Sequence, residues 1–312
     1  MTISTAPVPL RVPAGRRLLR LVAIAACLPY LSLKLAWIAG SHLGIPDGSP
    51  LLEHRLALAL ANGLTVLMDA AVVVLALLLT RPWGRRVPAW LLAVPMWLAM
   101  GLLAPIMVDF PLQLVLHGGG GGHSAGKPFL ADWVFAVVYG GFIAQGLALG
   151  ALFTGYARER WGLLWRGRVR ELPAGGAPRA QGRTAVAAAL LALFPGALRL
   201  LRACGAASPD GSGDRSLQCV YLLFLAAAVL GAWQLAYRRG RALPVAVPLA
   251  LAWTGSAAVA CWGGWMALGA LVTGNRPTVP TCLTYAGQMV TGVLVASVIA
   301  RFLTDRSAKA PQ

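Results

Sequence analysis

Residues 158–183 read RERWGLLWRGRVRELPAGGAPRAQGR, an arginine-rich segment that separates two apolar stretches of similar length in a chain of 312 residues. Only 12% of all residues are charged, about half the proportion typical of soluble domains, and the mean hydropathy is +0.70. Apolar runs on both sides exceed the roughly 20 residues that cross a hydrocarbon core as a helix. The alternation of barrel strands is absent, so transmembrane helices are predicted.

These runs predict an all-α fold, a polytopic transmembrane helix bundle of about eight spans. We place the spans near residues 19–41, 57–80, 87–110, 131–156, 184–205, 217–237, 243–272 and 282–304. The chain then divides into a basic N-terminal tail (1–18), a first four-helix repeat (19–157), the arginine-rich connector (158–183), a second four-helix repeat (184–304) and a C-terminal tail (305–312).

The formal net charge of +17 is concentrated in alternate connections between these spans. These connections hold 20 of the 27 basic residues, namely Arg11, Arg16, Arg17, Arg20, Arg81, Arg85, Arg86, Arg158, Arg160, Arg166, Arg168, Arg170, Arg179, Arg183, Arg238, Arg239, Arg241, Arg301, Arg306 and Lys309. Positively charged loops stay on the cytoplasmic side. Both termini are therefore predicted to be cytoplasmic, in a bacterial cytoplasmic membrane. Anionic membrane lipid explains the arginines, and no nucleic-acid partner is predicted.

Sequence features recur in the same order in the two halves, which indicates an internal repeat. Three sets match: Pro29, Lys34 and Gly40 with Pro195, Arg199 and Gly205; Tyr139, Gly141 and Gly146 with Tyr285, Gly287 and Gly292; and residues 158–160 with residues 304–306. Because a unit of four spans returns to the side on which it began, the two copies would have the same orientation, which is a parallel repeat.

Lys34 and Asp69 lie within the first and second predicted spans, where an ionisable side chain costs a few kcal/mol. Polar and aromatic residues share the same helix faces at helical spacing. The candidate binding residues are Tyr30, Lys34, Trp37, Asn62, Thr65 and Asp69. They predict a polar pocket between the first two spans that opens outward. Two alternatives stay open: an ion pair that only fixes how the two helices dock, or two side chains that never meet.

All four histidines fall in predicted outer loops of the first half: His42, His54, His117 and His123. Their spacing matches no established zinc signature, and His117 and His123 are separated by five consecutive glycines. We therefore predict no metal site and no cofactor. Cys204 and Cys219 flank one outer loop, where a disulfide and two free thiols are both compatible with the sequence.

Stretches such as Pro29-Tyr30-Leu31-Ser32-Leu33-Lys34 and Tyr139-Gly140-Gly141-Phe142, together with heavy use of Ala, Leu, Arg and Gly, resemble multipass membrane proteins of high-GC Gram-positive bacteria. This resemblance is one of amino-acid usage and extends over the whole chain. It implies no activity.

The leading prediction is a carrier for a small organic molecule that binds at the charged pocket, because duplicated bundles with a charged site at mid-membrane are common among carriers. The predicted partners are membrane lipid and a small-molecule or lipid-like ligand. One alternative is an intramembrane enzyme on a lipid or isoprenoid, for example a cyclase, with Asp69 or Asp109 as general acid and tryptophans sheltering a cation. Another is a non-catalytic membrane subunit, and the sequence names no protein partner.

Overall fold

The computed structural model describes residues 14–46, 55–116, 130–172, 179–205, 215–239, 242–274 and 276–308. Within these ranges the chain forms eight long helices and three short 3-10 turns. The long helices are α1 (Ala14–Ile38), α2 (Arg55–Thr80), α3 (Ala89–Leu116), α4 (Asp132–Trp161), α5 (Arg179–Ala203), α6 (Arg215–Tyr237), α7 (Ala246–Thr273) and α8 (Val279–Ala308). The 3-10 turns are η2 (Pro82–Arg86), η3 (Gly162–Trp165) and η4 (Val169–Glu171).

All eight long helices in the described residues are long and apolar enough to cross a membrane. Large apolar side chains are exposed on their outer faces, for example Leu60, Val115, Leu193 and Leu271. Such a surface is unfavourable in water and suits a hydrocarbon solvent. The chain is therefore a multi-pass membrane protein, as its apolar runs predicted.

Each predicted span overlaps one of these helices, but several ends differ. The first helix begins at Ala14, inside the predicted basic tail. The third continues to Leu116 through Pro105 and Pro111, whereas we expected it to end near residue 110. A proline removes one helical hydrogen bond, and neighbouring helices can compensate for that loss in a membrane span. Asp109 therefore lies well inside α3.

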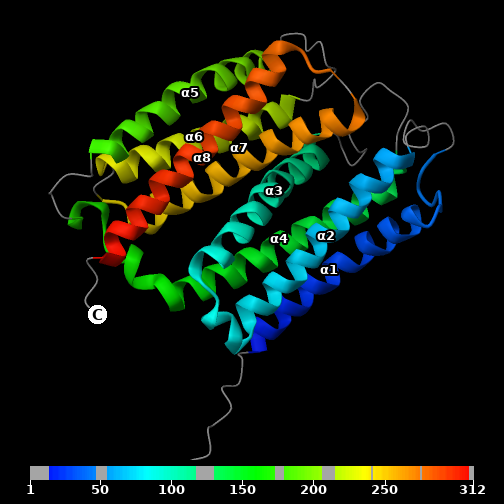
Figure 1. Cartoon of the computed structure of the whole chain (residues 1–312), viewed down its shortest axis with the longest axis horizontal. Helices are drawn as coiled ribbons and strands as arrows, with labels where there is room; N and C mark the ends of the chain where they lie inside the picture. The colour runs from blue at the N-terminus through cyan, green and yellow to red at the C-terminus, as the bar shows by residue number, and fades with distance from the viewer. Residues whose placement is uncertain are drawn as a thin grey trace, which may run out of the picture.

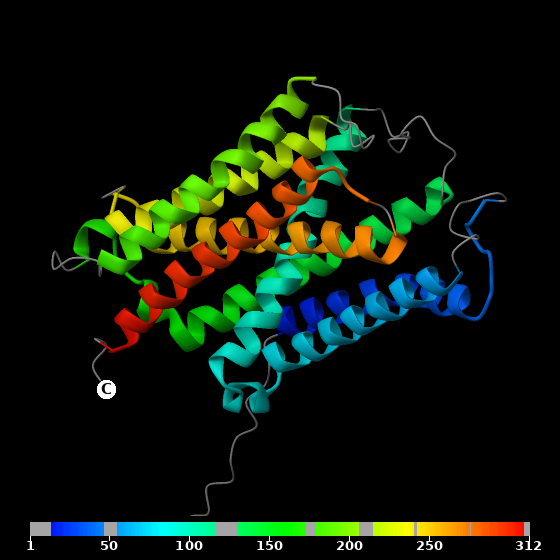
Figure 2. The same cartoon turned by 45° about the horizontal axis from the view of Figure 1, so that its top comes forward.

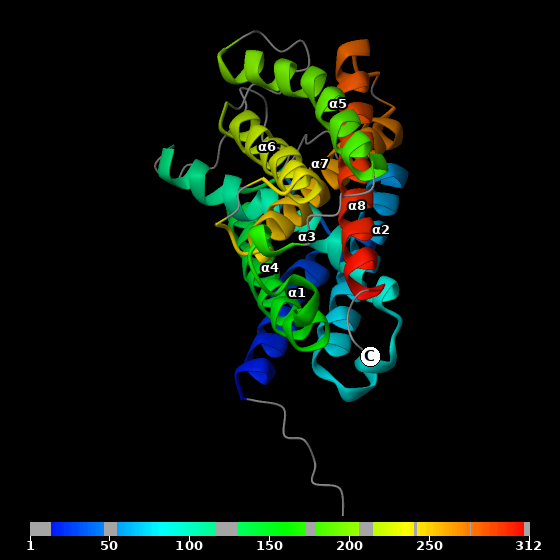
Figure 3. The same cartoon turned by 90° about the vertical axis from the view of Figure 1, so that its left-hand side faces the viewer.

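The helices form two groups, α1–α4 and α5–α8 (Figure 1). In each group the first helix packs against the second and the fourth, and the third packs against the fourth. The groups meet mainly where α3 packs along α7, and α3 crosses between them (Figure 2). The N-terminal end of α1 and the C-terminal end of α8 lie at the same end of the bundle (Figure 1). Figure 3 looks at that end and shows α5 beside α8.

The two groups differ in how tightly their second and third helices pack. A Cβ added to Gly231 of α6 or to Gly255 of α7 would overlap backbone atoms of the facing helix, so these two helices are in close backbone contact. In contrast, α2 touches α3 only sparsely, and the two diverge from η2 (Figures 1 and 2). The interior of the first group is consequently more open than that of the second.

Candidate functional site

A cavity of about 610 Å³ lies inside the first group, between α1, α2, α3 and α4, with part of one wall supplied by α7. This volume is within the range of about 300–1,000 Å³ that is usual for sites that bind drug-sized ligands. It extends from Trp37 and Leu130, at one end of α1 and α4, to Leu75 and Pro95, nearer the other end of α2 and α3. Most of its lining is apolar, and Lys34 and Asp69 supply its two charged side chains.

The charge of Lys34 is accommodated by neighbours on α1 and α2. Its Nζ donates a hydrogen bond to Asn62 Oδ1 at 2.8 Å. The same ammonium lies over the ring of Tyr30, at 4.7 Å from the centroid, and over the ring of Trp37, at 4.9 Å. Aromatic faces attract cations by about 0.5–2 kcal/mol each. These three contacts hold Lys34 at the cavity wall.

Asp69 is 4% exposed and lies deeper along α2. Its Oδ1 accepts a hydrogen bond from Gln145 Nε2 of α4 at 3.4 Å. Its Oδ2 is buried without a hydrogen-bond partner among the described residues. Buried polar atoms normally have partners, so this oxygen is the unsatisfied position in the cavity. Lys34 and Asp69 thus share the cavity while each bonds to a different residue.

The cavity is open between α2 and α3. Ala71 of α2 and Leu98 of α3 line the cavity and are both exposed, Leu98 to 46%. Since α2 and α3 touch sparsely and these two lining residues reach the surface, we interpret the space between the two helices as the opening of the cavity. The pocket was expected to open toward the outside, and these exposed lining residues indicate a lateral opening.

The structure brings most of the predicted binding residues to this one cavity. Tyr30, Lys34, Trp37, Thr65 and Asp69 all line it. Asn62 is 1% exposed and supports Lys34 from behind. The cavity is wider than the predicted pocket between two spans, because α3, α4 and α7 also contribute to its lining.

Asp109 lies apart from the lining residues of this cavity. Its carboxylate accepts hydrogen bonds from Gln113 Nε2 at 2.7 Å and from Ser216 Oγ at 3.2 Å. Because Ser216 lies at the start of α6, Asp109 links α3 to the second group instead of sharing a site with Asp69.

Several lining residues were not identified from the sequence. They are Phe135, Tyr139, Phe142 and Gln145 of α4, and Trp262 and Trp265 of α7. Gln145 is an amide within an apolar run, and a polar side chain inside a span was a readable signal. The tryptophans gave none, because tryptophan is equally common at the membrane interface.

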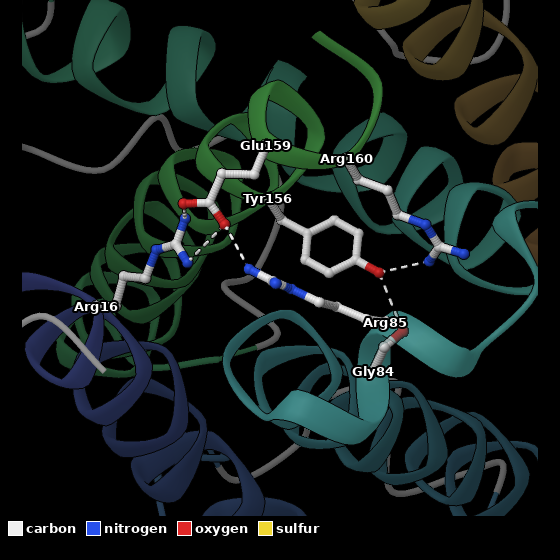
Figure 4. Close-up of polar contacts among 6 residues, drawn as sticks. All are labelled: Arg16, Gly84, Arg85, Tyr156, Glu159 and Arg160. Atoms are coloured by element: carbon white, nitrogen blue, oxygen red, sulfur yellow. Dashed lines mark hydrogen bonds and ion pairs between the residues drawn. The ribbon is translucent and has the colours of Figure 1, made fainter. Parts of the chain in front are cut away.

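The end of the first group opposite Trp37 is closed by packed side chains. Buried residues from three helices fill it: Cys27, Leu92, Met96, Leu149 and Leu152. Beyond them, polar contacts join α1, η2 and α4 (Figure 4). Glu159 pairs with Arg16 and with Arg85, the latter at 3.3 Å. These three side chains are 24–66% exposed.

A second, more buried set of contacts fixes α4 to η2 at this end. The hydroxyl of Tyr156 donates to Gly84 O at 3.0 Å and accepts from Arg160 Nη1 at 2.6 Å (Figure 4). Arg160 Nη2 donates to Val87 O at 2.8 Å. In the described structure this end is therefore closed by the buried hydrogen bonds of Tyr156 and Arg160 and by the exposed ion pairs of Glu159.

In the second group, the interior around Arg199 is filled by polar side chains. Arg199 Nη1 donates to Gln218 Oε1 at 2.9 Å, and Nη2 donates to Gln288 Oε1 at 3.4 Å. The guanidinium also lies over the ring of Tyr221, at 4.1 Å from the centroid. Arg199, which the predicted repeat pairs with Lys34, is therefore held by residues of α6 and α8.

Of the four histidines, His54, His117 and His123 lie outside the described residues. In the described ranges no three His, Cys, Asp or Glu side chains gather as metal ligands would. Cys204 and Cys219 are both free thiols. The geometry on which a function can be based is therefore that of the cavity.

No family model, curated protein or solved structure matches the chain.

Proposed function

We propose that the protein is a carrier of a small amphipathic molecule in a bacterial cytoplasmic membrane. The observation that supports this most is the cavity itself, which places Lys34 and Asp69 deep in an otherwise apolar space inside the membrane-spanning bundle. Ionisable residues at such depth usually mark a substrate or ion pathway. The lateral opening at Ala71 and Leu98 would admit a ligand that is already dissolved in the bilayer.

The proposal includes the topology that the charge distribution predicts. Arginines in alternate connections favour cytoplasmic termini, so the end closed by Glu159 would face the cytoplasm. The two groups of four helices would be parallel repeats, of which the first keeps an open interior for the ligand. Shared helix contacts in the two groups support this relation.

A carrier must expose its site to each side in turn, and the closed end is built in a way that allows opening. Opening would break the exposed Glu159 pairs with Arg16 and Arg85, which contribute about 0–1 kcal/mol each. It would also break the more buried hydrogen bonds of Tyr156 to Gly84 and of Arg160 to Val87, at about 0.5–3 kcal/mol each. A ligand that binds the two states differently by a few kcal/mol can then shift the population. Part of α1 and η2 would move away from the end of α4.

Thiol accessibility tests this function. Thr65→Cys, in a background without other cysteines, places one thiol in the cavity wall, and an impermeant reagent is added from one side at a time. For a carrier we expect labelling from both sides, with the ratio changing when a ligand binds. Thr154→Cys, on an exposed face of α4, is the control for a lipid-facing thiol. If the thiol at position 65 is labelled from neither side, the carrier proposal is wrong.

A second function, an intramembrane enzyme on a lipid-like substrate, is favoured by one specific observation. Asp69 shares the cavity with Trp262 and Trp265, and aromatic rings can stabilise a cation formed after protonation by a carboxylic acid. Labelling from one side only, with a chemically altered ligand recovered from the protein, would favour this function. Recovery of unaltered ligand favours the carrier, and a non-catalytic subunit would release no specific ligand.

A further inference from the structure

We infer that the cavity selects an apolar molecule whose polar end is a hydrogen-bond donor, an amine or a hydroxyl, and that it discriminates against an acid of the same skeleton. This deepens the proposed function and depends on the cavity being its binding site. The presence of Lys34 would ordinarily point to an anionic ligand. The contacts of the two charged residues point the other way.

Asp69 supplies the unsatisfied acceptor. Its side chain is more than nine-tenths buried, it lines the cavity, and Oδ2 has no hydrogen-bond partner in the described part of the chain. Oδ1 has only the long contact of 3.4 Å with Gln145. A ligand N–H or O–H placed against Oδ2 would make a charge-assisted hydrogen bond, which is stronger than one between neutral groups.

Lys34, by contrast, already has its partners. Its ammonium bonds to Asn62 and lies over two aromatic rings. A ligand carboxylate could still accept a hydrogen bond from a Lys34 N–H that Asn62 does not use, because an ammonium has three donors. In the same cavity, however, it would meet the like charge of Asp69, and two carboxylates that share a site repel each other. This repulsion offsets what an acid gains at Lys34.

The walls define the rest of the ligand. Phe135, Phe142 and Trp265 belong to a lining that is mostly carbon, which favours an apolar body of drug-like size. The lateral opening past Leu98 faces lipid, so the ligand would enter from the bilayer. Aromatic walls favour an ammonium over a hydroxyl, while the nearby charge of Lys34 favours the uncharged group. Whether the cavity prefers the ammonium or the hydroxyl is therefore decided by experiment.

The test compares three ligands of one skeleton on the purified full-length protein in lipid nanodiscs. Naphthylethylamine, naphthylethanol and naphthylacetic acid are titrated calorimetrically. The better of the amine and the alcohol should bind about tenfold or more tightly than the acid, the ratio expected for one hydrogen bond to a charged group. The amine-to-alcohol ratio then identifies the preferred donor.

Variants locate the contact. Asp69→Asn should weaken the preferred donor by about tenfold or more, and Asp69→Glu, which keeps the charge, should weaken it less. Asp305→Asn, far from the cavity at the end of α8, is the matched control and should leave binding unchanged. The comparison of the three ligands on the unmodified protein stands even where a variant fails to fold.

Tightest binding by the acid, with loss of that binding in Lys34→Gln, would overturn the inference while leaving the carrier proposal intact, because the cavity would still be the site. Equal binding of all three ligands, or binding of none, would also overturn it. The thiol-labelling result at position 65 then decides separately whether the proposed function fails as well.

Discussion

Asp69 and Lys34 line the same cavity, yet they do not bond to each other. Lys34 bonds to Asn62, and Asp69 bonds to Gln145. This arrangement differs from a buried ion pair that locks two helices together. In such a pair, removing one partner strands the other charge and destabilises the protein by about 3–5 kcal/mol. Here Lys34 would keep Asn62 and its two aromatic faces after Asp69 is changed.

We therefore predict that Asp69→Asn has almost no effect on stability without ligand. The free energy of unfolding should change by less than about 1 kcal/mol, since a neutral amide costs less to bury than a carboxylate and Lys34 retains its contacts. Chemical denaturation in mixed micelles measures this, with Asp305→Asn as the control. A loss of several kcal/mol would mean that Asp69 fixes the docking of α1 and α2.

At the scale of helices, the ion pairs of Glu159 distinguish the C-terminal end of α4 from that of α8. Glu159 joins α1 and η2 through Arg16 and Arg85, and Tyr156 binds Gly84 nearby. The predicted repeat pairs Glu159 and Tyr156 with Asp305 and Phe302, and phenylalanine has no hydroxyl with which to make the Tyr156 contact. The ionic contact is thus found in the half that contains the cavity.

We predict that Glu159→Gln shifts the protein toward opening at this end. Losing two exposed ion pairs, each worth about 0–1 kcal/mol, should raise labelling of Thr65→Cys from the side on which the Glu159 end lies by about threefold to tenfold. Asp305→Asn is the matched control and should not change labelling. Unchanged labelling in Glu159→Gln would show that the contact does not control access.

Close packing of α6 and α7 explains why the second group is filled where the first is open. Gly255→Ala would place a Cβ against the backbone of Ala228, and overpacking of this kind costs about 1–3 kcal/mol. Gly140→Ala is a matched control, because open space surrounds a Cβ at that helical position. Thermal unfolding should show a lower midpoint for Gly255→Ala alone. Equal midpoints would contradict close contact between these helices.

Across the whole molecule, the eight helices and the depth of Lys34 and Asp69 could be predicted, because both follow from one strong rule, the cost of polarity in lipid. The end of α3 could not, since Pro105 and Pro111 suggest termination in isolation. The contribution of α7 to the cavity also could not, because it depends on how two groups of helices dock. Contacts between distant helices leave no spacing pattern in the sequence.

The same limit applies to the opening of the cavity. The sequence places Asp69 in α2, but Leu98 becomes part of the cavity mouth only because α3 diverges from α2 beyond η2. We propose that this first group changes between two arrangements, one open at the α2–α3 gap and one open at the Glu159 end.

Distances between spin labels test that claim most directly. One pair, at Leu60 and Leu116, spans the diverging ends of α2 and α3; the other, at Trp83 and Leu163, spans the η2–α4 contact at the closed end. All four side chains are exposed. Each pair is measured by pulsed electron resonance in nanodiscs, with and without Glu159→Gln. We predict that the substitution lengthens the second distance and shortens the first. One unchanged distribution for both pairs, with and without ligand, would contradict the carrier.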